Sequence, residues 1–600
     1  MRLAAARMRA RTVARRGTLA GWDWAIPAGL IAALLAPMVL TSRTFGQDWP
    51  NHLWLVWQQG RNVSALGHPS YFLDSNLGAL YPIYAFYGGT LYAVAGTLSA
   101  LLGNHATVAY VAVFAASFVA AFAGCTWLSL ELGLRGWRAQ ILGVIYVASA
   151  YYLTSAYGRG DFPELVATSA LPVVIASALH LLRRPSLAPL PVAVFALAAV
   201  VMTGSHAITL VWGTTFLVAL AVVTAVAFSA RGLPRGRPLV VAGVFALSVG
   251  VNLWFLLPAA AYHGKVGIGR TAARARELGG GAQNRAQDIF DPLRTNALGP
   301  HPLLISPTNA RVPVVALAWA MLALAAGWPR LPRSWRRVAV GLAVILIVLL
   351  ALIMFHQPWA LVPTPWRYVQ FTIRLQTYVT LAVAGLVVVG ILAVQSMRRG
   401  RARAALMGAV AAVGVLTVAQ GVVQAWTVPS VLPSRDTVFR NAHAPPSSWY
   451  AQLDYADASA PIVGSTLGPI AGLTTGGGPN SLARVTLPVD RPRAGYSFTY
   501  VSPGPGTIPT NVATGTYLVK VTGARPVGRS PDGTMVLALG DPPGRVSRLA
   551  FSVIDRTPIG LGLAGTVVSV LGLVTLLGVL ARRRRTPRGT RAGPGVSGSA

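Results

Sequence analysis

Long apolar stretches alternate with clusters of arginine along most of this chain. About twelve stretches approach the length of about 20 residues that a helix needs to cross the hydrocarbon core of a bilayer, and arginines stand at every second junction between them. Because arginine clusters remain on the cytoplasmic side of a membrane, they fix which loops face outward. The pattern therefore predicts an all-α polytopic membrane protein.

Composition excludes an ordinary soluble enzyme. Hydrophobic residues make up 54% of the chain, charged residues make up only 11%, and the mean hydropathy is +0.56. The net charge of +34 does not indicate a nucleic-acid partner, because the arginines gather at span ends, where they meet anionic lipid headgroups. The single cysteine, Cys125, lies in an apolar stretch, so there is no disulfide framework and no cysteine-rich metal site.

The arginine clusters assign a side of the membrane to each part of the chain. Residues 1–24 form a basic cytoplasmic leader that lacks the cleavage pattern of a signal peptide, and residues 582–600 form a disordered basic cytoplasmic tail. Both termini therefore face the cytoplasm, and residues 25–426 form the transmembrane domain. We expect twelve spans, at residues 25–41, 106–131, 139–157, 163–182, 188–203, 206–229, 238–258, 312–328, 338–355, 372–396, 404–426 and 559–581.

The outward-facing segments are the more polar ones. The first outer loop, 42–105, contains two apolar segments, 50–66 and 81–103. The chain must cross the membrane an odd number of times to return to the cytoplasm, and the span 106–131 is enough. We therefore predict that both segments are helices lying on the outer membrane surface. A polar loop at 259–310 also faces outward. Residues 427–558 contain alternating and β-branched runs separated by turn residues, which predicts a small extracytoplasmic β-rich domain. No inverted pair of broken spans, as found in transporters, is visible.

Asp48 is the first candidate for chemistry. It follows the first span in the motif GQDWPNHLW, so its carboxylate lies at the membrane–water boundary, where partial desolvation makes it a better general base. Its position before Pro50 also suits a helix N-cap, and one residue can do both. His52 and Trp54 in the same motif are candidates for substrate binding; the aromatic residues of this loop equally suit the interfacial aromatic belt.

The loop YGRGDFPE brings Arg159, Asp161 and Glu164 together between two spans. Three charges at a membrane surface are costly unless they pair or meet a ligand. Arg159 could bind a phosphate through its bidentate fork. The alternatives are an internally paired cluster of Arg159 with Glu164 and a solvated loop.

Two further motifs place basic residues at outer span ends. His206 in MTGSHAITL stands in a very short turn, where a hydrogen-bonded helix end is the alternative to catalysis. Arg367 and Arg374 in PTPWRYVQFTIR lie on the side of the membrane that disfavours arginine. They are candidates for binding an anionic ligand, with snorkelling to lipid phosphates as the alternative. Trp366 and Tyr368 beside them are candidates for substrate binding.

These motifs, in this order, resemble bacterial membrane proteins called "6-pyruvoyl-tetrahydropterin synthase-related" and, more broadly, the GT-C superfamily of integral-membrane glycosyltransferases. The resemblance covers about residues 20–400. It rests on four matches: an acid followed by His-Leu, an Arg-Gly-x-x-x-Glu loop, a Ser-His turn and a Pro-Trp-Arg motif, here Asp48 with His52 and Leu53, Arg159 to Glu164, Ser205 with His206, and Pro365 to Arg367. The chain departs from the family in having Thr364 where phenylalanine is usual.

The resemblance implies that the protein transfers a sugar from a polyprenyl-phosphate donor to an envelope glycan, lipid or protein acceptor on the outer face of the cytoplasmic membrane. Asp48 would then act as the base, with Glu164 or His206 orienting it. Arg159, Arg367 and Arg374 would stabilise the donor phosphate. We therefore expect Asp48, Arg159, His206 and Arg367 to converge in one outward-facing cavity. Asp161 joins His52, Trp54, Trp366 and Tyr368 as a residue expected to contact substrate. No cofactor besides the lipid-linked donor is implied, and no metal ligand is assigned.

Two other classes of function remain open. A transporter or flippase of lipid-linked glycans would carry charges at mid-membrane depth and pseudo-symmetric halves, whereas the charges here lie at span ends. A non-catalytic assembly protein would use the outer β-rich domain to bind polysaccharide. The absence of Walker, HExxH, CxxC and GxSxG motifs argues against ATP hydrolysis and against a serine nucleophile.

Overall fold

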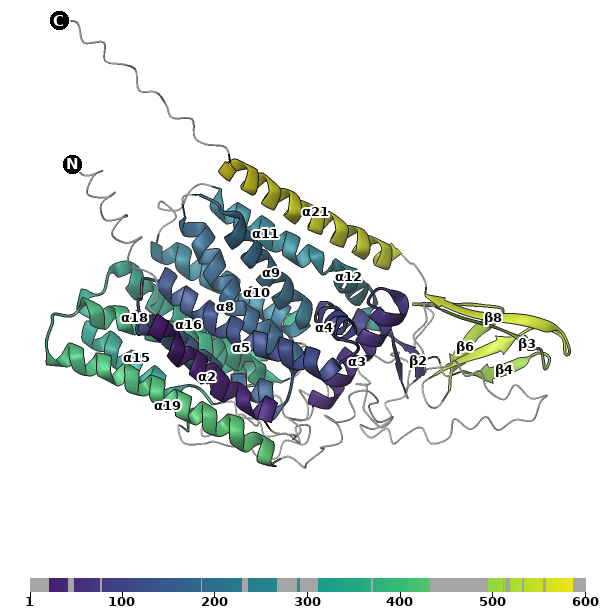
Figure 1. Cartoon of the computed structure of the whole chain (residues 1–600), viewed down its shortest axis with the longest axis horizontal. Coiled ribbons are helices and arrows are strands. Elements are labelled where there is room, and N and C mark those ends of the chain that lie inside the picture. The colour runs from purple at the N-terminus through teal and green to yellow at the C-terminus, as the bar shows by residue number, and fades with distance from the viewer. Residues whose placement is uncertain are drawn as a thin grey trace, which may run out of the picture.

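The computed structural model is a bundle of long helices with a small β region beyond one end (Figure 1). It describes residues 21–40, 48–75, 78–184, 186–228, 236–266, 289–291, 311–367, 369, 371–431, 495–510, 512, 518–530, 534–553 and 557–585. Four predicted segments lie wholly or mostly outside these described residues: most of the leader 1–24, most of the loop 259–310, residues 432–494 of the outer domain and most of the tail.

Each of the twelve predicted spans coincides with a helix or with a pair of helices. Seven helices of the described chain are long and apolar enough to cross a membrane. They are α5 (Ala106–Glu131), α8 (Phe162–Arg183), α10 (Ala207–Phe228), α16 (Arg333–Met354), α18 (Gln376–Ser396, preceded by the 3₁₀ turn Thr372–Leu375), α19 (Arg401–Val431) and α21 (Thr557–Arg585). The protein is therefore a membrane-spanning helical protein.

Two predicted spans are broken helices. Helix α6 (Trp137–Val147) is followed, after a bend of 50°, by α7 (Ala150–Leu153) and a π-helical turn (Thr154–Gly158). Helix α11 (Arg237–Val251) meets α12 (Leu253–Tyr262) and a further 3₁₀ turn at 73°. Counting each pair as one span gives nine. Each pair was predicted as one span without a bend, because hydropathy does not record a bend.

Three remaining predicted spans are apolar helices of 10–17 residues, too short by themselves for a full crossing. They lie in α2 (Gly21–Leu40), α9 (Pro189–Ser205) and α15 (Val314–Gly327, followed by a 3₁₀ turn to Arg330). About twelve full spans are therefore not confirmed. The His206 turn is confirmed, because it joins the last residue of α9 to the first of α10.

The first outer loop is more structured than the sequence indicated. The segment 81–103 is not one helix: an antiparallel hairpin of β1 (Leu73–Ser75) and β2 (Gly78–Tyr81) and a 3₁₀ turn (Ile83–Ala85) precede α4 (Gly89–Leu101). Helix α3 (Trp49–Leu66) packs against α4. Two of its polar side chains, Gln59 and Asn62, are buried and joined by a hydrogen bond of 2.7 Å from Asn62 to Gln59. That internal bonding was not expected of a helix lying on a membrane surface.

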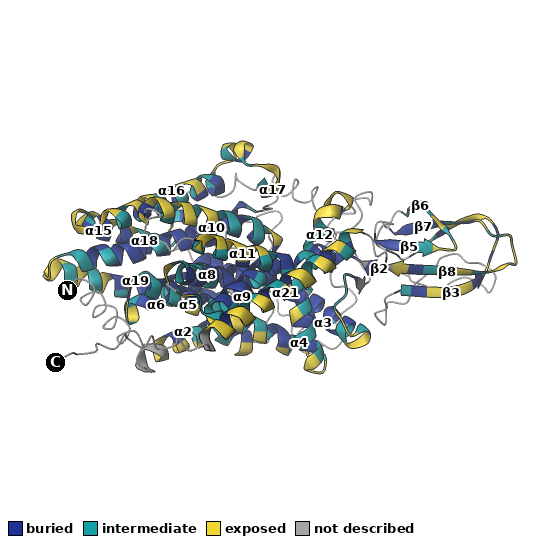
Figure 2. Cartoon of the chain, turned by 90° about the horizontal axis from the view of Figure 1, so that it is seen from above, coloured by how far each residue is buried: buried dark blue, intermediate teal, exposed yellow. Residues whose placement is uncertain are grey.

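The centre of the bundle holds the functional candidates. Figure 2 shows α8 among the buried residues, whereas α21 exposes much of its length. Helix α8 packs against α5 and α9, and α18 packs against α15 and α16. Helix α8 has Asp161 and Glu164 at its start and Arg183 at its end, and α18 follows the turn that contains Arg374 and ends close to Arg398.

The described part of the C-terminal region forms two small antiparallel sheets. One has the strand order β3 (Gly495–Val501), β8 (Val546–Val553), β5 (Val519–Thr522); the other has β4 (Gly506–Pro509), β7 (Met535–Leu539), β6 (Arg525–Arg529). Alternate residues such as Leu549 and Phe551 of β8 and Leu537 of β7 are buried, as period-two strands require. In Figure 1 this region lies past the end of the bundle at which α3 and α12 are found.

Candidate functional site

Backbone geometry brings the loop Arg159–Asp161 into the interior of the bundle. The π-helical turn ends with the amide of Arg159 donating to the carbonyl of Thr154 at 2.7 Å, and such turns often mark functional sites. Gly160 then adopts φ +69°, a conformation that side chains with a Cβ rarely adopt. Asp161 caps α8 by accepting a hydrogen bond of 3.2 Å from the amide of Glu164, and Pro163 favours the helix start.

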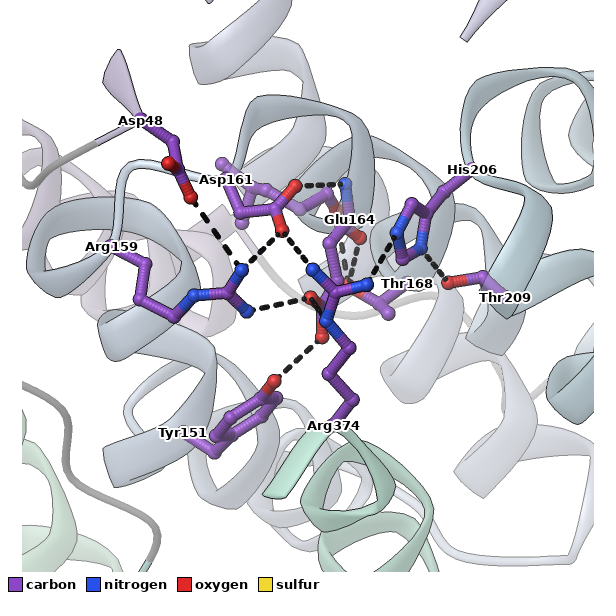
Figure 3. A network of polar contacts seen from close by, with 10 residues as sticks. Asp48, Tyr151, Arg159, Asp161, Glu164, Thr168, His206, Thr209 and Arg374 are labelled. Carbon is purple, nitrogen blue, oxygen red and sulfur yellow. Dashed lines mark hydrogen bonds and ion pairs between the residues drawn. The ribbon is translucent and has the colours of Figure 1, made fainter. Parts of the chain in front are cut away.

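Four segments contribute to one charged cluster (Figure 3). Arg159 lies 2.9 Å from Asp161, 3.2 Å from Glu164 and 3.5 Å from Asp48. Arg374, from the turn that opens α18, lies 3.2 Å from Asp161 and 3.3 Å from Glu164. Two guanidinium groups therefore face three carboxyl groups, and the cluster carries no excess positive charge.

Asp48 differs from the other acids in its exposure. Its side chain is 21% exposed, against 1% for Asp161 and 2% for Glu164. It stands at the N-cap position of α3, but its side chain makes no cap hydrogen bond and is directed at Arg159 (Figure 3). Its amide also donates to the carbonyl of Arg159 at 2.9 Å. The helix-cap explanation of this residue is therefore not supported by the structure.

Glu164 is bonded from several sides. Besides the two arginines, the hydroxyl of Tyr151 donates to its carboxylate at 2.7 Å. The ring of Phe371 lies against both guanidinium groups, 5.4 Å from that of Arg159 and 5.6 Å from that of Arg374. The cluster at YGRGDFPE is thus internally paired and buried, which excludes the solvated-loop alternative.

His206 is held as a neutral imidazole. Because a guanidinium only donates, Nε2 of His206 accepts from Arg374 at 3.3 Å, and Nδ1 carries the proton that it donates to Thr209 at 2.9 Å. Burial, and then the charge of Arg374, lowers the pKa of His206 to about 3.

For Asp161, burial opposes ionisation, but the charges of Arg159 and Arg374 together outweigh it and hold the pKa of this carboxyl group below its usual range.

His52 lies one helical turn after Asp48 and is buried. Its Nδ1 is 2.6 Å from the hydroxyl of Tyr92, and its ring stacks on Tyr87 and Tyr92. Nε2 has no hydrogen-bond partner among the residues that the structure describes. Burial lowers the pKa of His52 to about 4, and the charges of Asp161, Arg159 and Arg374 also act on it. Tyr87 packs edge-on against His206, so the rings of His52 and His206 both contact Tyr87.

The structure separates the PTPWRY motif from the cluster. Arg367 donates to the carbonyls of Val362 and Ala360, in its own loop, and is partly exposed. Trp366 donates to Thr215 at 2.7 Å, on the side of α10. Arg367 therefore does not converge with Asp48, Arg159 and His206 as expected, because its side chain folds back on its own turn. Trp54 is buried, and Tyr368 lies outside the described residues.

Sequence reasoning missed Tyr151, Phe371, Tyr87 and Tyr92. Phe371 stands three residues before Arg374, which is the spacing of neighbours on one helical turn. Tyr151 gave no signal, because it lies in an apolar run where aromatic residues are ordinary core residues. Tyr87 and Tyr92 belong to the first outer loop, whose aromatic residues also suit the interfacial belt.

The acids and the histidine also form a set of metal-ligand type. One ligand atom each from Asp161, Glu164 and His206 lie within 4.8 Å of one another, and all three residues are buried. Comparison with known proteins adds no identity to this geometry: the chain matches no protein-family model and no curated protein sequence.

Proposed function

We propose that the protein is an integral-membrane glycosyltransferase of the GT-C type. It transfers a sugar from a polyprenyl-phosphate donor to an envelope glycan, lipid or protein acceptor on the outer face of the cytoplasmic membrane. The observation that carries the proposal is the partly exposed carboxylate of Asp48, which lies 3.5 Å from the buried guanidinium of Arg159.

Asp48 is the base in this reaction. It accepts the proton of the acceptor hydroxyl while the new bond forms at the anomeric carbon and the bond from that carbon to the donor phosphate breaks. The leaving polyprenyl phosphate takes the electron pair. Positive charge develops on the sugar as this happens, and a cluster with three carboxyl groups favours such charge. Glu164 and His206 position Arg159 and Arg374 rather than acting as bases, because arginine contacts engage both residues.

The surrounding residues receive distinct roles. Arg159 is the candidate for the donor phosphate, because its guanidinium lies 3.5 Å from Asp48, whereas Arg367 lies apart from the cluster. Nε2 of His52 is available to a substrate hydroxyl, because a buried nitrogen without a partner costs about 1–3 kcal/mol.

Helix polarity supports an outer site. In α8 the cluster lies at the first turn and Arg183 at the last, so about 30 Å of helix separates them at the usual rise per residue. In α18 the cluster precedes the helix and Arg398 follows it. If the arginine-rich ends face the cytoplasm, the cluster faces outward.

The test is sugar transfer by the purified full-length protein in lipid nanodiscs, with a panel of radiolabelled polyprenyl-phosphate sugars. Asp48→Asn keeps the shape of the side chain but removes the base, and we expect a loss of at least about 100-fold. Glu131→Gln is the matched control, because Glu131 is also an ion-paired, largely buried acid but lies at the opposite end of α8, beside His180. Equal activity of Asp48→Asn and the wild type would refute the proposal.

A flippase of lipid-linked glycans is the second candidate, and the two broken helices favour it, since transporters build their substrate sites from discontinuous spans. A second assay, in proteoliposomes, separates the two functions when it is run beside the nanodisc assay. A flippase moves a fluorescent lipid-linked sugar between leaflets of proteoliposomes without forming a new glycosidic product, whereas the proposed transferase forms the product.

A further inference from the structure

A guanidinium group stands among the three residues of metal-ligand type. Each nitrogen of Arg374 faces a different one of them: Nη2 lies 3.2 Å from Oδ2 of Asp161, Nε lies 3.3 Å from Oε2 of Glu164, and Nη1 lies 3.3 Å from Nε2 of His206. These three are the same residues whose ligand atoms lie within 4.8 Å of one another. Figure 3 shows Arg374 reaching into this set from the turn before α18.

We infer that Arg374 takes the place of a divalent cation in this site, so that the wild-type protein binds no metal ion at Asp161, Glu164 and His206. A buried acidic site needs a positive charge, which either a metal ion or an arginine can supply. Arg374 supplies it here: Nη1 and Nη2 form hydrogen bonds with His206 and Asp161, and Nε lies within ion-pair distance of Glu164.

The neighbours of Arg374 support this assignment. Arg159 approaches Oδ2 of Asp161 and Oε2 of Glu164, the two oxygen atoms that Arg374 also approaches. The two arginines balance the two buried acids. A divalent ion added among them would carry its charge next to two guanidinium groups in a buried site, where repulsion is poorly screened.

The tautomer of His206 also supports the inference that Arg374 replaces a metal ion. Nε2 is the nitrogen that accepts from Arg374, while Nδ1 is held by Thr209. A metal ion would need the lone pair of Nε2, which Arg374 already uses. Arg374 would have to leave before a metal ion could bind.

The experiment measures binding of Mn²⁺ to the full-length protein in nanodiscs by the loss of the free-ion signal in electron paramagnetic resonance. We expect the wild type and His206→Ala to bind the same small amount. Arg374→Ala is expected to gain about one tightly bound ion, and Arg374→Ala/His206→Ala to lose it again. Arg374→Lys, which keeps the charge, is expected to gain none.

The inference is overturned if the wild type binds one equivalent of Mn²⁺ that His206→Ala abolishes. It is also overturned if folded Arg374→Ala, with a normal elution volume, binds no more Mn²⁺ than the wild type. Should Arg374→Ala fail to fold, the comparison of the wild type with His206→Ala still decides the matter. Because the readout is metal binding, its failure is distinct from failure of the proposed sugar transfer, which we expect to be insensitive to EDTA.

Discussion

Asp48 and Asp161 both stand at the beginning of a helix, yet their carboxyl groups meet different surroundings. The carboxylate of Asp161 accepts hydrogen bonds from the amide of Glu164 and from two guanidinium groups in the interior, whereas that of Asp48 lies beside Arg159 and its side chain is 21% exposed. A buried, fully engaged acid holds structure, and an accessible one can exchange protons with a substrate. This difference is why we assign the base to Asp48.

Glu164 is expected to be a stability residue. Glu164→Gln leaves Arg159 and Arg374 with one buried acid fewer, and breaking a buried pair by removing one partner costs about 3–5 kcal/mol. Glu131→Gln should cost about 1 kcal/mol or less, because Arg184, one of its partners, is well exposed. Thermal unfolding in the same detergent compares the two, and equal losses would contradict the buried cluster.

His52 makes stability depend on pH in a defined window. Its pKa is about 4 in the folded protein, against 6.5 ordinarily. Between pH 6.5 and pH 4, the unfolded chain therefore binds a proton at this histidine and the folded protein does not. The free energy of unfolding therefore falls as the pH drops from 6.5 towards 4, by about 2 kcal/mol between pH 6.5 and 5 from this residue. His52→Gln should flatten the pH profile of the unfolding temperature, and the exposed His68→Gln should not.

At the scale of elements, apolar length predicted where helices lie but not where they bend. The span expected at 106–131 coincides with α5, because a continuous apolar run leaves one helix as the only satisfied backbone. The span expected at 139–157 bends at Ala148 and Ser149, where the hydroxyl of Ser149 donates to the carbonyl of Tyr146 at 2.8 Å. That bend depends on local hydrogen bonds that hydropathy does not reveal.

The connection between the π-helical turn and α8 depends on Gly160. Gly160→Ala forces a Cβ into φ +69°, at a cost of about 1–2 kcal/mol, and also shifts Arg159 relative to Asp161. Gly67→Ala is the matched control, since Gly67 has φ +76° and a Cβ added there would meet no atom within 4 Å. Both variants should lose stability in thermal unfolding, but Gly160→Ala should lose more. Equal losses would mean that Gly160→Ala acts through backbone strain alone and does not displace Arg159 from Asp161.

At the scale of the whole molecule, the sequence located most of the site residues but did not predict the contacts between them. Asp48, Arg159 and His206 were expected to meet, and they do, through Arg374 and Asp161. Arg367 was expected to join them and does not. The sequence alone does not separate it from Arg374, because which of two nearby arginines turns inward depends on the packing of α10 and α18.

The sidedness of the protein gives the last prediction. If the arginine-rich ends face the cytoplasm, a cysteine at the exposed position His68, after α3, or at Thr507 in β4 should react with a membrane-impermeant maleimide in intact cells. A cysteine at Arg399, between α18 and α19, should react only after permeabilisation. Wild-type protein provides the background, because Cys125 is buried. Labelling of Arg399→Cys in intact cells, or of His68→Cys and Thr507→Cys from opposite sides, would contradict an outward-facing cluster.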